Sequence, residues 1–182
     1  FRGFSSFRLS HLGRVNLLVG TNNSGKTTVL EAIEILSSLG DIRTLWRSMY
    51  RRGENVWHSD DRRRGMEVET SHLLHGHEFA ITAQATRTAE AVLVSVEERT
   101  RNSPDQQTLF DLDENYEGPF RLRVFSSSGS SDGEAVLPLS IQGGLSENAL
   151  HNLRPVKRLV EREVRYISTS ALQVDEVLSL FN

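Results

Sequence analysis

The stretch Gly20-Thr21-Asn22-Asn23-Ser24-Gly25-Lys26-Thr27 fits the pattern G-x-x-x-x-G-K-[ST] without a mismatch. The apolar run Val15 to Val19, broken only by Asn16, precedes it and predicts a buried strand. The residues that follow, 26–39, predict a helix. Strand, glycine loop and helix in this order are the context in which the pattern forms a phosphate-binding P-loop.

The chemistry of the predicted site follows from its residue types. Glycines let backbone N–H groups approach phosphate oxygens closely, and the start of a helix adds unpaired N–H groups and a partial positive charge. Lys26 is predicted to reach the β- and γ-phosphates of ATP as the catalytic cation, and Thr27 to offer its hydroxyl to Mg²⁺. The predicted nucleotide-binding residues of the loop and first turn are Asn22, Asn23, Ser24, Gly25, Lys26, Thr27 and Thr28. A chance glycine-rich turn is the alternative.

Composition bounds the remaining possibilities. The chain has 182 residues, 37% hydrophobic and 25% charged, which suffices for a domain core. No run approaches the roughly 20 apolar residues that span a bilayer, and no signal peptide is evident. The absence of cysteine excludes disulfides and thiolate metal sites, and it suits a cytoplasmic protein. A net charge of −3 gives the surface as a whole no strong attraction for nucleic acid.

The rest of the chain predicts an α/β fold with an antiparallel subdomain over residues 66–144. Alternating apolar residues predict strands over 66–74, 78–85, 92–98, 120–125 and 136–141, with a hairpin loop at 126–133. Residues 1–9 predict a strand that forms a hairpin with the P-loop strand. In the helix after the P-loop, an apolar face is expected to face the core, with Glu31 and Glu34 off that face. A second short helix is predicted over 42–52.

The N-terminal sequence resembles the ABC-type ATPases of the RecF, SMC and OLD group. The similarity is carried by Phe1-Arg2-Gly3-Phe4, which matches an F-[RK]-x-F element, and by the segment from Val15 to Ile33, which matches N-x-L-x-G-x-N-x-[SA]-G-K-[ST] and the residues that follow. The OLD-like branch, many of whose members are linked to phage defence, looks most similar. The resemblance implies a P-loop NTPase fold and the N-terminal lobe of an ABC-type ATPase.

That family also requires a signature motif, a Walker B strand and a switch histidine, and none of them is found here. The segment 109–114 ends in Asp-Glu, but Asp111 interrupts the apolar run that a Walker B strand needs. We therefore expect residues 1–182 to be the N-terminal part of one ATPase domain whose C-terminal half is absent. In this division 1–40 form the hairpin, P-loop and first helix, 66–144 the antiparallel sheet, and 153–182 the return to the core.

Two further site residues are implied by the resemblance alone. Members of the group carry a Mg²⁺-coordinating glutamine after the strand that leaves the N-terminal lobe, and Gln173 follows the predicted strand 164–169. An exposed residue at a helix start is the alternative for Gln173. Arg2 is the basic residue of F-[RK]-x-F and is expected to touch the nucleotide, or else to be a surface arginine. Arg62, Arg63 and Arg64 form either a solvated loop or a contact with a DNA backbone.

The sequence thus predicts an ATPase that uses ATP and Mg²⁺. The resemblance further implies a homo-oligomer, a nuclease as partner or fused domain, and nucleic acid as a ligand of the full protein. The tasks that the resemblance implies for ATP hydrolysis are DNA repair, phage defence and chromosome handling. A nucleotide-binding interaction module without hydrolysis, serving as a regulatory or scaffold subunit, is the alternative. A GTPase would need an N-K-x-D element, which the sequence lacks.

Overall fold

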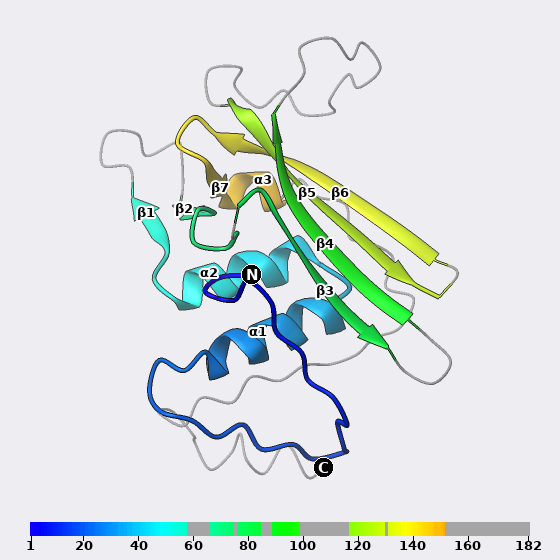
Figure 1. Cartoon of the computed structure of the whole chain (residues 1–182). Helices are drawn as coiled ribbons and strands as arrows, with labels where there is room; N and C mark the ends of the chain where they lie inside the picture. Colours follow the sequence, from blue (N-terminus) through cyan, green and yellow to red (C-terminus); the bar gives the residue numbers. More distant parts are fainter. Residues whose placement is uncertain (58–65, 75, 85–88, 99–116, 130, 152–182) are drawn as a thin grey trace, which may run out of the picture.

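The computed structural model describes residues 1–57, 66–74, 76–84, 89–98, 117–129 and 131–151 (Figure 1). Within these ranges the chain forms three helices and seven strands. The helices are α1 (Lys26–Ser37), α2 (Ile42–Arg51) and α3 (Glu147–His151). The two longer helices confirm the predictions for 26–39 and 42–52, apart from their last residues.

Local sequence explains where α1 ends and α2 begins. Gly40 adopts φ +72°, and its N–H donates to the carbonyl of Ile35 at 2.9 Å, which closes the last turn of α1. Asp41 then caps α2, since its carboxylate accepts a hydrogen bond from the N–H of Arg43 at 2.9 Å. The short connection places the two helices side by side in the chain and in space (Figure 1).

The strands form two antiparallel sheets. The smaller sheet has the order β1-β2-β7, and the larger is a meander with the order β3-β4-β5-β6. The strands are β1 (Asn55–Trp57), β2 (Met66–Glu69), β3 (Glu78–Gln84), β4 (Ala89–Glu98), β5 (Glu117–Ser128), β6 (Ser131–Ser140) and β7 (Gly144–Ser146). The antiparallel pairing predicted for these strands is therefore present, with β2 belonging to a separate sheet.

Alternation along the meander gives it one buried face. Val94 lies opposite Val124, and Leu122 lies opposite Leu137, so apolar side chains of adjacent strands stack on the same side. The helices α1 and α2 cover this face (Figure 1) and complete one core. The core residues are Ile35, Ile42, Leu45, Trp46, Met49, Val68, Leu73, Phe79, Val92, Val94, Leu122, Val124, Leu137, Leu139, Leu145, Ala149 and Leu150.

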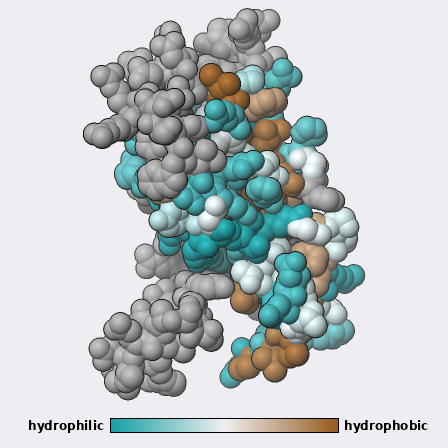
Figure 2. All heavy atoms as spheres, turned by 90° about the vertical axis from the view of Figure 1, so that its left-hand side faces the viewer, coloured by the Kyte–Doolittle hydropathy of each residue, from teal (hydrophilic) through white to brown (hydrophobic). Residues whose placement is uncertain are grey.

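Two predictions for the N-terminal region are wrong. Residues 1–9 form a turn and an irregular segment, and residues 15–19 form no strand. Val15, Leu17 and Val19 are 91%, 86% and 82% exposed. A buried strand needs ladder partners on its flanks, and within the described residues neither sheet extends to this segment. The segment instead belongs to a long loop below α1 in Figure 1, where Figure 2 shows exposed apolar surface.

Two smaller differences concern turns and short elements. The predicted loop 126–133 is shorter, because β5 runs to Ser128 and β6 starts at Ser131. Paired serines there extend the hairpin although their composition is typical of a loop. The short elements β1, β7 and α3 were not predicted, since three to five residues carry too little periodicity to be recognised.

Candidate nucleotide-phosphate site

The start of α1 has no side-chain cap. Its N-cap is Gly25, which adopts φ +84° and has no side chain to accept a hydrogen bond. The first helical hydrogen bond runs from Val29 N–H to the carbonyl of Gly25 at 3.1 Å, so the N–H groups of residues 26–28 have no acceptor within the helix. The first turn also carries no acidic residue. This arrangement suits an anion.

Lys26 folds back over the loop that precedes it. Its Nζ donates hydrogen bonds to the carbonyls of Gly20 and Thr21 at 2.7 and 2.6 Å, and to the hydroxyl of Ser24 at 3.3 Å. All three contacts are exposed, so they are weak and a bound anion competes with them readily. The ammonium group and the uncapped helix start therefore lie within one loop.

The other predicted loop residues differ in exposure. Asn22, Asn23, Ser24 and Thr27 are exposed, and Asn23 adopts φ +64°, a conformation that asparagine tolerates better than most residues. The exposed hydroxyl of Thr27 is a hard oxygen ligand of the kind that Mg²⁺ prefers. Thr28, by contrast, is buried. The hydrogen-bond donors of this loop thus fit a triphosphate, and its hydroxyl oxygen fits Mg²⁺. The assignment of these residues as binding residues stays a prediction.

The N-terminal turn packs against the same loop. The ring of Phe4 lies directly over the Cα of Gly25, so that a Cβ at position 25 would lie 2.8 Å from Cε2 of the ring. Phe7 lies beside Phe4, with ring centroids 4.9 Å apart. This role of Phe4 was not predicted from the sequence. The only sequence signal for it is the position of the F-[RK]-x-F element shortly before the P-loop.

Arg2 is buried, which makes the alternative of a surface arginine wrong. Its side chain is 5% exposed, and its guanidinium contacts Glu31 at 2.9 Å, Glu54, and the hydroxyl of Ser48 at 3.3 Å. None of these partners belongs to the phosphate loop. Direct contact between Arg2 and the nucleotide stays a prediction, and the contact that the structure gives is with Glu31 of α1.

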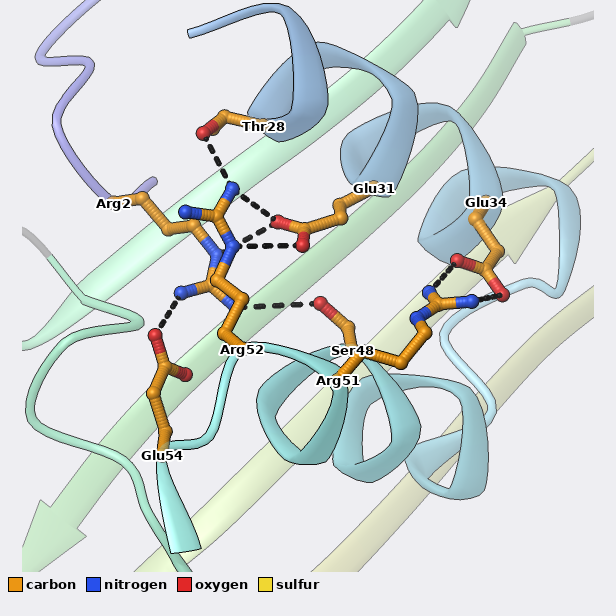
Figure 3. A network of polar contacts seen from close by, with 8 residues as sticks. All are labelled: Arg2, Thr28, Glu31, Glu34, Ser48, Arg51, Arg52 and Glu54. Carbon is orange, nitrogen blue, oxygen red and sulfur yellow. Dashed lines mark hydrogen bonds and ion pairs between the residues drawn. The ribbon is translucent and has the colours of Figure 1, made fainter. Parts of the chain in front are cut away.

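The face of α1 that packs against α2 is charged. Glu31 and Glu34 are buried, whereas Leu30 and Ile33 are 43% and 42% exposed, so the predicted orientation of the helix is wrong in this respect. The reason is that α2 ends in arginines: Arg51 pairs with Glu34, and the arginine that follows pairs with Glu31 (Figure 3). Charged residues on a buried face are stable when they are paired in this way.

The contacts among the residues around α1 form a network that the sequence did not predict, although Arg2 and Thr28 were predicted as binding residues. Its members are Arg2, Thr28, Glu31, Glu34, Ser48, Arg51, Arg52 and Glu54 (Figure 3). One signal was available: two glutamates three residues apart lie on one helical face, and two consecutive arginines close the next helix after a short connection. Complementary charges on consecutive helices predict that these faces meet.

A groove of about 340 Å³ lies elsewhere, on the outer face of the meander. Arg123 lies in it and pairs with Glu97 at 3.2 Å and with Glu134. The hydrogen bond from Arg123 to Glu134, together with that to Glu97, raises the pKa of Arg123 above its ordinary value. The charge of Arg123 is thus paired with carboxylates of the same sheet.

Several sequence-based assignments lie outside the described residues: Gln173, the arginine run 62–64, the segment 109–114 and the return to the core over 153–182. Among the residues that the structure does describe, no cluster of histidine and carboxylate side chains could hold a metal ion. In the same ranges, no helix has the length and apolar character needed to cross a bilayer.

The architecture and the loop are those of the broad class of P-loop NTPases. The chain has an α/β fold, a G-x-x-x-x-G-K-T loop, a lysine folded over that loop and an uncapped helix start. Comparison with protein families identifies the chain further: the AAA ATPase domain matches residues 1–116. The chain belongs to this family, which implies the binding and hydrolysis of ATP. Neither the curated proteins nor the solved structures gave a match.

Proposed function

We propose that the chain binds ATP with Mg²⁺ through residues 22–28 and takes part in ATP hydrolysis as a lobe of an ABC-type ATPase. The observation that carries this proposal is the coincidence of the Lys26 ammonium group with the uncapped start of α1. Both features favour negative charge, and they occur within one loop, as recognition of a phosphate chain requires.

The residues of the loop would share the work of phosphoryl transfer. Lys26 and the N–H groups of the first turn would stabilise the negative charge on the β- and γ-phosphates, and the Thr27 hydroxyl would hold Mg²⁺. Mg²⁺, when bound, neutralises part of the charge on the phosphates. The resemblance to the RecF, SMC and OLD group supports the further proposal of ATP-controlled dimerisation and a DNA-related task.

A nucleotide-binding module without hydrolysis is the second candidate. The observation in its favour is that Glu31 and Glu34, the carboxylates that follow the P-loop in sequence, are each paired with arginine. A carboxylate held in this way does not serve as a base that orients water. Phosphate release separates the candidates: turnover that is lost on Lys26→Ala supports the ATPase, and binding without turnover supports the module.

Calorimetry with ATP and Mg²⁺ tests the site itself. We expect Lys26→Ala to weaken binding at least about 30-fold while the unfolding midpoint stays unchanged, because a charged contact to phosphate is lost and only exposed contacts hold Lys26 in the protein. Arg47→Ala is the control, since it removes an exposed positive charge from α2. Equal affinity in the Lys26→Ala variant and the parent would refute the site.

A further inference from the structure

Arg52 joins the end of α2 to the first residue after the GKT element. It is the C-cap residue of α2. Its Nη2 donates to the Thr28 hydroxyl at 2.9 Å and to Glu31 at 3.0 Å, and its Nε donates to the other oxygen of Glu31 at 2.8 Å (Figure 3). The planar guanidinium thus spans two residues of α1 that are one turn apart, which a lysine could not do with the same geometry.

The contact constrains the hydroxyl of Thr28. A hydroxyl group has one donor and two acceptor sites, and the bond from Arg52 uses an acceptor site. Within the described residues Arg52 is the hydrogen-bond partner of this side chain, and no bond occupies the hydroxyl proton. The proton is therefore directed away from Arg52, on a side chain that is itself buried. Thr28 also belongs to the first helical turn, whose N–H groups lack helical acceptors.

Glu31 connects this contact to the N-terminal turn. Its carboxylate, 2% exposed, contacts Arg2 as well as Arg52, and Arg2 also pairs with Glu54. Two arginines and two glutamates make the group neutral. Because a buried charge is costly without its partners, each member holds the others in place. Glu31 accordingly holds Arg52 beside Thr28, and Arg2 in turn holds Glu31.

We propose that Arg52 is a positioning residue for the nucleotide: through Thr28 and Glu31 it sets the hydroxyl and the backbone of the first turn of α1 for contact with a phosphate oxygen. The proposal rests on the proposed binding of ATP at this loop. Arg52 does not itself belong to the loop, and it is not a catalytic residue. Its effect is on the affinity and orientation of the phosphate chain.

The neighbouring Arg51 provides a matched control. It also ends α2 and also pairs with a buried glutamate of α1, and its side chain is 34% exposed against 32% for Arg52. Its partner Glu34 lies about one turn further from the loop. Arg51→Met and Arg52→Met should therefore lower stability by similar amounts, whereas only the second should change the phosphate site.

The experiment measures unfolding by urea and binding of Mg²⁺-ATP by calorimetry for the parent, the two methionine variants, Thr28→Val and the double variant. We expect Arg52→Met to weaken ATP binding about tenfold, the loss typical of one charge-assisted hydrogen bond, and Arg51→Met to leave it unchanged. Thr28→Val should weaken binding similarly, and adding it to Arg52→Met should change little further, because the two residues act through one contact. Arg52→Lys should bind with intermediate affinity.

The outcomes separate this inference from the function on which it rests. If the parent fails to bind ATP, the proposed function is wrong and the inference falls with it. If the parent binds ATP and Arg52→Met binds as tightly as Arg51→Met, the function stands and the inference is overturned. Should Arg52→Met not fold, the ATP affinities of Arg52→Lys and Thr28→Val are compared with that of the parent. Parental affinity in both variants refutes a positioning role for Arg52.

Discussion

Replacing Gly25 by alanine perturbs the start of α1 in two separable ways. The residue adopts φ +84°, which costs a residue with a Cβ about 1–2 kcal/mol. The new methyl group would also meet the ring of Phe4, and displacing a packed side chain costs about 1–3 kcal/mol. We therefore expect Gly25→Ala to lower the free energy of unfolding by about 2–5 kcal/mol.

Gly143→Ala isolates the backbone contribution. Gly143 adopts φ +81°, and nothing lies within 4 Å of the Cβ that it would gain. Gly143→Ala should therefore lower the free energy of unfolding by the backbone strain alone, about 1–2 kcal/mol. Any effect of alanine on the unfolded chain is common to both variants. The difference between the two free energies therefore measures the displacement of the Phe4 ring.

Urea denaturation followed by circular dichroism supplies both free energies, provided the m-values agree. Repeating Gly25→Ala in a Phe4→Ala background should remove the difference, because the obstacle is then absent. If Gly25→Ala lowers the free energy of unfolding no more than Gly143→Ala does when Phe4 is present, that result would refute the packing of the Phe4 ring over the loop in solution.

Three further outcomes follow from the described contacts. Glu31→Gln should lower the free energy of unfolding by about 3 kcal/mol in urea denaturation, because it removes the buried carboxylate that both Arg2 and Arg52 contact; parental stability would contradict the buried network. Gly40→Ala should cost about 2–5 kcal/mol in the same assay, since its Cβ would lie 2.8 and 2.9 Å from methyl groups of two core valines; a cost near that of Gly143→Ala would contradict this packing. Arg123→Ala should leave the thermal midpoint unchanged, as its ion pairs are exposed, and a clear drop would show that they stabilise the meander.

The elements that local pattern determines could be predicted from the sequence. The spacing of Gly20, Gly25 and Lys26 indicated the P-loop, and period-two alternation indicated the strands of the meander. The N-terminal strands were predicted wrongly, because pairing is a property of neighbours and the apolar run at Val15 carries no information about them. An apolar pattern shows that a segment prefers burial, and it does not show what covers it.

The charged contacts around α1 depend on the packing of elements far apart in the chain. Arg2 and Glu54 are 52 residues apart and meet only because the N-terminal turn lies beside the end of α2. The periodicity of α1 placed Glu31 outside the core on the assumption that charge avoids burial. That assumption fails where a partner of opposite charge is buried with it, and a single helix cannot reveal its partner.

The paired charges between α1 and α2 also govern how these helices can move against each other. An apolar contact between two helices tolerates small slides, because one methyl group substitutes for another along the interface. The ion pairs Glu34–Arg51 and Glu31–Arg52 differ in this respect, since a slide of one helix along the other would lengthen both of them. The ion pairs therefore favour one relative position of α1 and α2, and a displacement of the end of α2 would act on the first turns of α1 through Arg52 and Glu31.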